Sequence, residues 1–243
     1  MDLKLKSNQM NNYTDKLINS QNKELWENLD KDFQITLTKS HEPNYLINFK
    51  NDKITIYVDE HDLRPSSFTH ELLHIEMKRN EKNIGKHLDL LIQENDQLHY
   101  LFSLPLRDHI GNCLEHVKML PKFLELGFSN SEFISDFVTK KMTNTEWSNI
   151  KSAYLNNKIF DKQAVDFLIG KFFGMKACNN KKHNYSKYYS GIAKLDRKLS
   201  KAINEFWNDW LTFNPSDQSD DYSEMIELII ADLNDWQNGK TII

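Results

Sequence analysis

The sequence predicts an α+β protein that is mostly helical, in which a small N-terminal antiparallel sheet precedes a His-Glu-x-x-His helix and then a helical bundle. Three observations support this prediction. Apolar residues recur at helical spacing along most of the chain. Three short segments before residue 60 alternate apolar and polar residues, as half-buried strands do. The 243 residues include only 7 Gly and 5 Pro, a low content that favours helices over loops.

Length, charge and cysteine content limit the classes of protein that the sequence represents. We expect a first region at residues 1–128 and a helical region at 129–243 that can pack with it as one domain. The net charge of -4 argues against nucleic acid as a partner. Cys113 and Cys178 are too few for a disulfide framework or a cysteine-based zinc site. Because residues 1–12 are polar and no run approaches a membrane span, we expect a cytoplasmic location and no membrane partner.

The N-terminal elements are assigned from their periodicity. Residues 13–29 carry apolar side chains at helical spacing, which predicts a helix. Alternating apolar and polar residues then predict three strands, at 33–39, 45–50 and 53–58. Asn51-Asp52 lies between the last two and suits a two-residue hairpin turn.

The motif helix is expected to run from residue 66 to residue 79. Pro65 is favoured at a helix start, where no partner is needed for its missing N–H. Phe68, Leu72 and Ile75 form an apolar stripe with further apolar residues beside it. The helix should therefore be buried on most sides.

The rest of the chain is predicted to be helical. Gly127 followed by Phe128 resembles a glycine helix cap with its apolar contact. Gly111 lies inside a predicted helix, where glycine costs ~0.5–1 kcal/mol relative to alanine, so we expect a second helix to pass close to it. The helices are expected at 85–102, 106–127, 130–138, 144–156, 161–176, 186–213 and 221–236.

The segment from Thr69 to His74 contains the chemistry that the sequence indicates most clearly. On a helix, His70 and His74 are four residues apart, so their imidazoles share a face and can bind one metal ion. Glu71 lies beside His70 and can act as general base on a metal-activated water. A strand, a short loop and a buried helix surround the motif, as this chemistry requires.

With these residues and this order of elements, the region from Phe33 to Leu120 resembles the zincin metallopeptidases. The resemblance implies Zn²⁺ as cofactor, His70 and His74 as ligands, and Glu71 as catalytic base. It also implies a peptide or protein substrate, which would lie extended along the strand at 53–58.

The third metal ligand lies outside the His-Glu-x-x-His motif. The metzincin branch is excluded, because Met77 and Asn80 stand where it requires glycine and histidine. A gluzincin-like site would take a glutamate from a later helix, and Glu115 is favoured, although the gluzincin Asn-Glu-x-x-Ser-Asp pattern is absent. His116 is the main alternative. The further candidates are Glu94, His99 and His109.

Polar residues near Glu115 have expected supporting roles. Asp108, Asn112 and Glu115 share one helix face. Asp108 could orient a ligand histidine by a hydrogen bond, without binding the metal itself. Asn112 or His116 could contact the substrate or the oxyanion.

We therefore predict a cytoplasmic zinc metallopeptidase, a hydrolase that uses a zinc-activated water. One alternative is a catalytically inactive binding or regulatory module with the same fold, such as a toxin or a phage-associated protein. Another is a zinc hydrolase of a non-peptide amide. The sequence indicates no particular oligomeric state.

Overall fold

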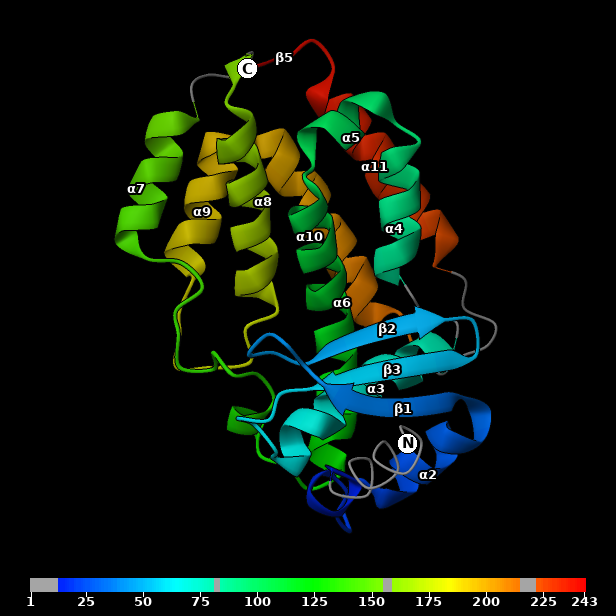
Figure 1. Ribbon diagram of the computed structural model, residues 1–243. Helices are drawn as coiled ribbons and strands as arrows, with labels where there is room; N and C mark the ends of the chain where they lie inside the picture. The colour runs from blue at the N-terminus through cyan, green and yellow to red at the C-terminus, as the bar shows by residue number, and fades with distance from the viewer. Residues whose placement is uncertain (1–12, 81–83, 155–158, 215–221) are drawn as a thin grey trace. The chain divides into compact units, whose positions relative to one another are not determined.

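The computed structural model describes residues 13–80, 84–154, 159–214 and 222–243. Most of these residues are helical, and a small mixed sheet lies near the start of the chain (Figure 1). The predicted α+β, mostly helical class is therefore confirmed.

The described residues form two compact units. The first contains residues 13–80 and Met119–Phe137, and the second contains residues 84–118 and Val138–Ile243. Each unit is thus built from two separate segments, whereas the two regions predicted from sequence are continuous stretches. The assignment of the catalytic role to the first of those regions stays a prediction.

The strands of the first unit lie where the sequence predicted them. Asn51, in the predicted hairpin turn, has a φ of 55°, a left-handed conformation that such turns need. The elements of this unit are α2 (Lys23–Asp32), β1 (Gln34–Lys39), β2 (Leu46–Lys50), β3 (Lys53–Val58), α3 (Pro65–Arg79), the end of α6 (Leu104–Glu125) and the 3₁₀-helix η1 (Asn130–Glu132).

The sheet is mixed, with strand order β1-β3-β2 (Figure 1). β2 pairs antiparallel with β3, but β1 pairs parallel with it, with Ile35 opposite Ile54 and Leu37 opposite Ile56. The prediction of an antiparallel sheet is therefore wrong for one pairing, because alternation reveals a buried face but not a strand's neighbour or direction. Since β3 is central, a peptide cannot pair with residues 53–58 as we expected, and the edges of the sheet are β1 and β2.

One core unites the inner faces of β1 and β3 with α3 and the end of α6. Ile56, Phe68 and Leu72 are fully buried in it, and Met119 and Phe123 of α6 belong to the same cluster. The motif helix is therefore buried on most sides, as the sequence predicted.

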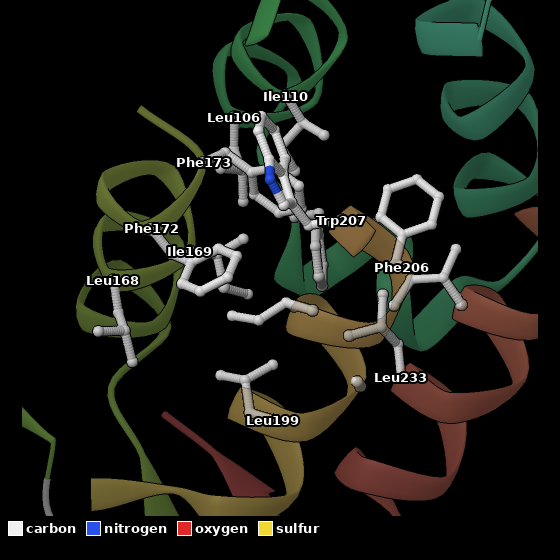
Figure 2. Close-up of a cluster of buried hydrophobic side chains, with 14 of the residues drawn as sticks. Leu106, Ile110, Leu168, Ile169, Phe172, Phe173, Leu199, Phe206, Trp207 and Leu233 are labelled. Carbon is white, nitrogen blue, oxygen red and sulfur yellow. The ribbon is translucent and has the colours of Figure 1, made fainter. Parts of the chain in front are cut away.

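The second unit is a set of helices around an aromatic-rich core. Figure 2 shows side chains from several of these helices pointing toward one another, and the Phe173 ring meets Phe206 and Trp207 edge-on. Short strands β4 and β5 pair in parallel. The elements are α4 (Ile84–Gln93), α5 (Asp96–Leu101), most of α6, α7 (Asn144–Ala153), β4 (Ile159–Phe160), α8 (Lys162–Lys176), α9 (Ser186–Leu195), α10 (Arg197–Thr212), α11 (Ser223–Gln237) and β5 (Thr241–Ile242).

Four predicted helices differ from those observed. The helix expected at 13–29 is interrupted at residues 18–22, and α2 begins only at Lys23. The helix expected at 186–213 is divided into α9 and α10 at Asp196, and the one expected at 85–102 is divided into α4 and α5 near Asn95. Both residues cap the later helix, because each side chain accepts a hydrogen bond from a main-chain N–H three residues on. At 130–138 only the 3₁₀ turn η1 forms.

Two glycine predictions are confirmed. A Cβ atom on Gly85 of α4 would lie 2.7 Å from the Cα atom of Gly111, so a second helix does pass close to Gly111. That helix is α4 and not the motif helix. Gly127 ends α6 with a φ of 92°, a conformation that glycine adopts easily, and Phe128 after it is buried.

Candidate metal centre

Helix α3 carries the motif, and buried hydrogen bonds fix its first turn. The Thr69 hydroxyl donates to the Pro65 carbonyl (2.6 Å), and the Asn22 side-chain amide donates to the Thr69 hydroxyl oxygen (2.9 Å). Asn22 is fully buried and also donates to the Leu17 carbonyl (2.9 Å). The residue directly before His70 therefore cannot move without breaking a buried network.

His70 and His74 direct the same ring nitrogen toward each other, as a shared metal ion requires. Their Nε2 atoms are 3.2 Å apart, and the ring centroids are 5.0 Å apart with an interplanar angle of 69°. Two nitrogens bound to one tetrahedral zinc at about 2.0–2.1 Å are separated by about 3.3 Å. The observed separation therefore fits a metal-binding pair.

His116 of α6 completes a group of three. One ring nitrogen of each of His70, His74 and His116 lies within 4.8 Å of the other two, and all three residues are partly buried. Glu115 is not part of this group. Adjacent helix residues point about 100° apart, so a helix that directs His116 toward the pair directs Glu115 elsewhere. The group thus contains the alternative that the sequence ranked second, and Glu115 as third ligand stays a prediction.

Two hydrogen bonds join α10 to the stretch of α6 that bears His116. The Trp210 indole donates to the Leu114 carbonyl (2.8 Å), and the Lys118 ammonium donates to the Leu211 carbonyl (3.1 Å) at the end of α10. Both contacts lie two residues from His116. They fix the rotation of α6 about its own axis, which decides where His116 points.

His70 lies in an apolar environment that keeps its imidazole neutral. Its ring centroid is 4.8 Å from that of Phe133, which is itself 4% exposed. The pKa of His70 is lowered to about 3, mainly because the ring is buried and also because His74 lies nearby, while the Phe133 main chain opposes this shift. A neutral imidazole is the form that binds a metal ion.

Phe133 was not predicted from sequence as part of the site. It follows η1, in a segment that we expected to be helical. Ser129 and Glu132 form a capping box around this turn, since the Ser129 main-chain N–H and hydroxyl both donate to the Glu132 carboxylate. That Ser-x-x-Glu pattern is the signal that could have located the turn.

Glu71 lies beside the histidines in partly buried surroundings. Burial raises the pKa of its carboxyl group, and the nearby His74 imidazole lowers it. A carboxyl group with a raised pKa exchanges protons closer to neutral pH than an exposed one. Glu71 is therefore a suitable candidate for moving a proton at this site.

The other predicted residues lie outside the three-histidine group. Asp108 and Asn112 are exposed on α6. Asp108 precedes His116 by two turns, about 12 Å along the helix axis, which is too far for it to orient that ligand. Asn112 is one turn before His116, so its substrate contact stays a prediction. His109 instead forms a hydrogen bond with the Gly170 carbonyl of α8 (3.1 Å), and Glu94 and His99 are exposed.

The residues present fit a divalent metal ion. Three imidazole nitrogens converge, and imidazole is a common ligand of zinc and other first-row transition metals. A His70/His74/His116 cluster could therefore bind a metal ion.

Comparison with known proteins gives no further indication of function. No protein-family model, curated protein or solved structure matches this chain. None of the described helices is long and apolar enough to cross a membrane. The resemblance to zincins stays a prediction, and function must be argued from the geometry of the site.

Proposed function

We propose that this protein is a zinc-dependent peptidase in which His70, His74 and His116 hold the metal ion and Glu71 is the general base. The observation that carries the proposal is the convergence of the three histidines, with the motif glutamate next to the first. The resemblance to zincins supplies the expected substrate class, a peptide or protein.

The donor set supports zinc as the metal. Three neutral imidazoles and no thiolate form a common ligand set for catalytic zinc, which keeps one position open. When bound, zinc supplies a Lewis acid that polarises a carbonyl group and lowers the pKa of a water molecule to about 7.

The chain's own groups would then perform the proton transfers. Glu71 accepts a proton from the attacking water and passes it to the leaving amine. His70 and His74 stay neutral while they hold the metal. The hydrogen bonds of Thr69 and Asn22 keep the start of α3, and so this arrangement, in place.

Peptide cleavage by the zinc-loaded protein tests this proposal. The wild type would be incubated with a mixed peptide library, and products would be identified by mass spectrometry. Glu71→Gln should retain zinc and lose at least about 10²-fold in rate, because general-base catalysis contributes about 10²–10⁴-fold.

Glu76→Gln is the matched control. Glu76 is on the same helix and forms an ion pair with Arg79 (3.5 Å), so its replacement removes a carboxylate from α3 without touching the motif. It should keep both zinc and activity. A Glu71→Gln variant that cleaves at the wild-type rate would refute the base assignment. A zinc-loaded wild type that cleaves no peptide would favour the non-catalytic alternative.

A further inference from the structure

Charge is unevenly distributed along the second unit. Residues 138–201 contain 14 lysines and arginines but only 4 aspartates and glutamates, whereas residues 202–239 contain 9 acidic residues and no lysine or arginine. The expectation of no nucleic-acid partner rested on the net charge of -4, which sums these opposite regions. The basic region comprises α7, α8, α9 and the start of α10, and its effect on binding depends on where its side chains lie.

The fold gathers part of this basic region at one end of the second unit, where the start of α7, the end of α8 and the start of α9 lie together (Figure 1). The Tyr185 hydroxyl accepts a hydrogen bond from the Lys141 main-chain N–H (3.0 Å). The Asn144 side-chain oxygen accepts from the Lys187 ammonium (2.6 Å) and the Tyr188 hydroxyl (2.9 Å). These bonds hold the segment before α7 against the segment between α8 and α9.

Six lysines lie in these joined segments and define the basic end of the unit: Lys140, Lys141, Lys176, Lys181, Lys182 and Lys187. In the part of the chain that the structure describes, the four exposed ones form no ion pair: Lys140, Lys181, Lys182 and Lys187. Lysines elsewhere in the unit do, since Lys171 pairs with Glu146 (2.5 Å) and Lys198 with Asp235 (2.7 Å). The basic end therefore carries positive charge that described carboxylates do not balance.

Such a surface fits a partner with many closely spaced negative charges. A single phosphate or carboxylate would balance only one or two of the six ammonium groups. A nucleic-acid duplex carries one negative charge per about 1.7 Å of its axis, and each phosphate that a lysine neutralises releases bound counterions, which favours binding. A duplex can therefore face several of these lysines at once.

The aromatic rings of the basic end are not available for base stacking. Tyr185 and Tyr188 are 7% and 5% exposed. The Tyr189 ring meets Phe172 edge-on at 5.8 Å, and the Lys176 ammonium lies over it at 4.9 Å. Because binding of single strands depends on rings that stack on bases, the arrangement favours contacts to phosphates over contacts to bases.

We propose that the basic end of the second unit binds the phosphate backbone of double-stranded nucleic acid without reading its base sequence. Lysine acts there as a point charge, which positions a duplex but carries no sequence information. The inference uses no residue of the metal centre, so its failure would leave the proposed function unaffected.

Fluorescence anisotropy of a labelled DNA duplex of about 20 base pairs, titrated with the full chain at several salt concentrations, tests the proposal. Affinity should fall steeply with salt and should be similar for duplexes of unrelated sequence. Each lost phosphate contact lowers the slope of log affinity against log salt by about 1. The double variant Lys181→Gln/Lys182→Gln should therefore bind more weakly, with a slope about 2 units shallower.

Lys16→Gln/Lys31→Gln is the matched control, because it removes two exposed lysine charges from the first unit. It should bind the duplex as the wild type does, and both double variants should keep the wild-type melting temperature. Absence of duplex binding at low salt would refute the proposal, as would equal weakening in both variants.

Two competitors test the kind of partner. A single strand of the same length should bind more weakly than the duplex, because its charges are more widely spaced. Tighter binding of the single strand would contradict recognition of a duplex backbone. Poly-glutamate that displaces the duplex at equal charge concentration would show instead that the basic end binds acidic polypeptides.

Discussion

Replacing Asp196 with alanine should destabilise the second unit by about 3–5 kcal/mol. Asp196 is 6% exposed, and its carboxylate accepts four hydrogen bonds. One oxygen caps α10 through the Leu199 N–H (3.0 Å). The other accepts from the Tyr154 hydroxyl (2.7 Å), the Trp236 indole (2.7 Å) and the Lys240 ammonium (2.9 Å).

The expected loss of stability follows from the hydrogen-bond donors that Asp196→Ala leaves without an acceptor. Loss of a cap costs about 1 kcal/mol, and each buried donor left without an acceptor costs about 1–3 kcal/mol. Lys240, 11% exposed, would lose its carboxylate, and breaking a buried pair costs about 3–5 kcal/mol. These contributions are not additive, because all four donors share one carboxylate. Lys240 also keeps its contacts over the Phe160 and Trp236 rings.

Urea unfolding followed by tryptophan fluorescence would measure this loss. Trp26 is in the first unit, and the other four of the five tryptophans are in the second, so the signal reports mainly on the second unit. Asp161→Ala is the control, because Asp161 caps α8 through the Ala164 N–H (2.9 Å) in the same unit. It should cost about 1 kcal/mol. If Asp196→Ala costs no more than Asp161→Ala, the reasoning about the buried network is wrong.

Three further predictions concern the pH dependence of stability, the contrast between Gly85 and Gly170, and Gly127. Burial raises the pKa of Asp196, but hydrogen bonds from Trp236, Leu199, Lys240 and Tyr154 outweigh it and lower the pKa overall. The stability difference between the wild type and Asp196→Ala should therefore be full above about pH 4 and shrink as pH falls further, which urea unfolding at pH 7 and pH 3 would show. Gly85→Ala should lower the free energy of unfolding by about 1–3 kcal/mol, because its Cβ would meet the Gly111 backbone, whereas Gly170→Ala, with 3.4 Å to its nearest neighbour, should be neutral or stabilising in the same assay. Gly127→Ala should lower the melting temperature, because alanine is strained at a φ of 92°.

Much of the secondary structure could be predicted because it depends on local patterns. The period of apolar residues located α3 and the three strands, and Asn51-Asp52 located the hairpin turn. The parallel pairing of β1 with β3 could not be predicted, since it depends on which neighbour a strand finds after a loop. The division of the long helix at Asp196 had a local signal, an aspartate that caps the residues after it, and the apolar period concealed it.

The site shows the same contrast between local and distant determinants. His70, Glu71 and His74 follow from one helix turn. The choice between Glu115 and His116 depends on the rotation of α6 by about 100°, which is set by contacts such as that of Trp210 with Leu114, 96 positions apart. The ring contact between Phe133 and His70 likewise depends on packing that brings a distant turn against the motif helix.

The central claim is a metal centre made of three histidines, and elemental mass spectrometry of the purified protein tests it most directly. The wild type and Glu115→Ala should each contain one zinc per chain. His116→Ala should lose most of it, as should His70→Ala. Zinc retained in His116→Ala and lost in Glu115→Ala would contradict the account and restore the glutamate as third ligand.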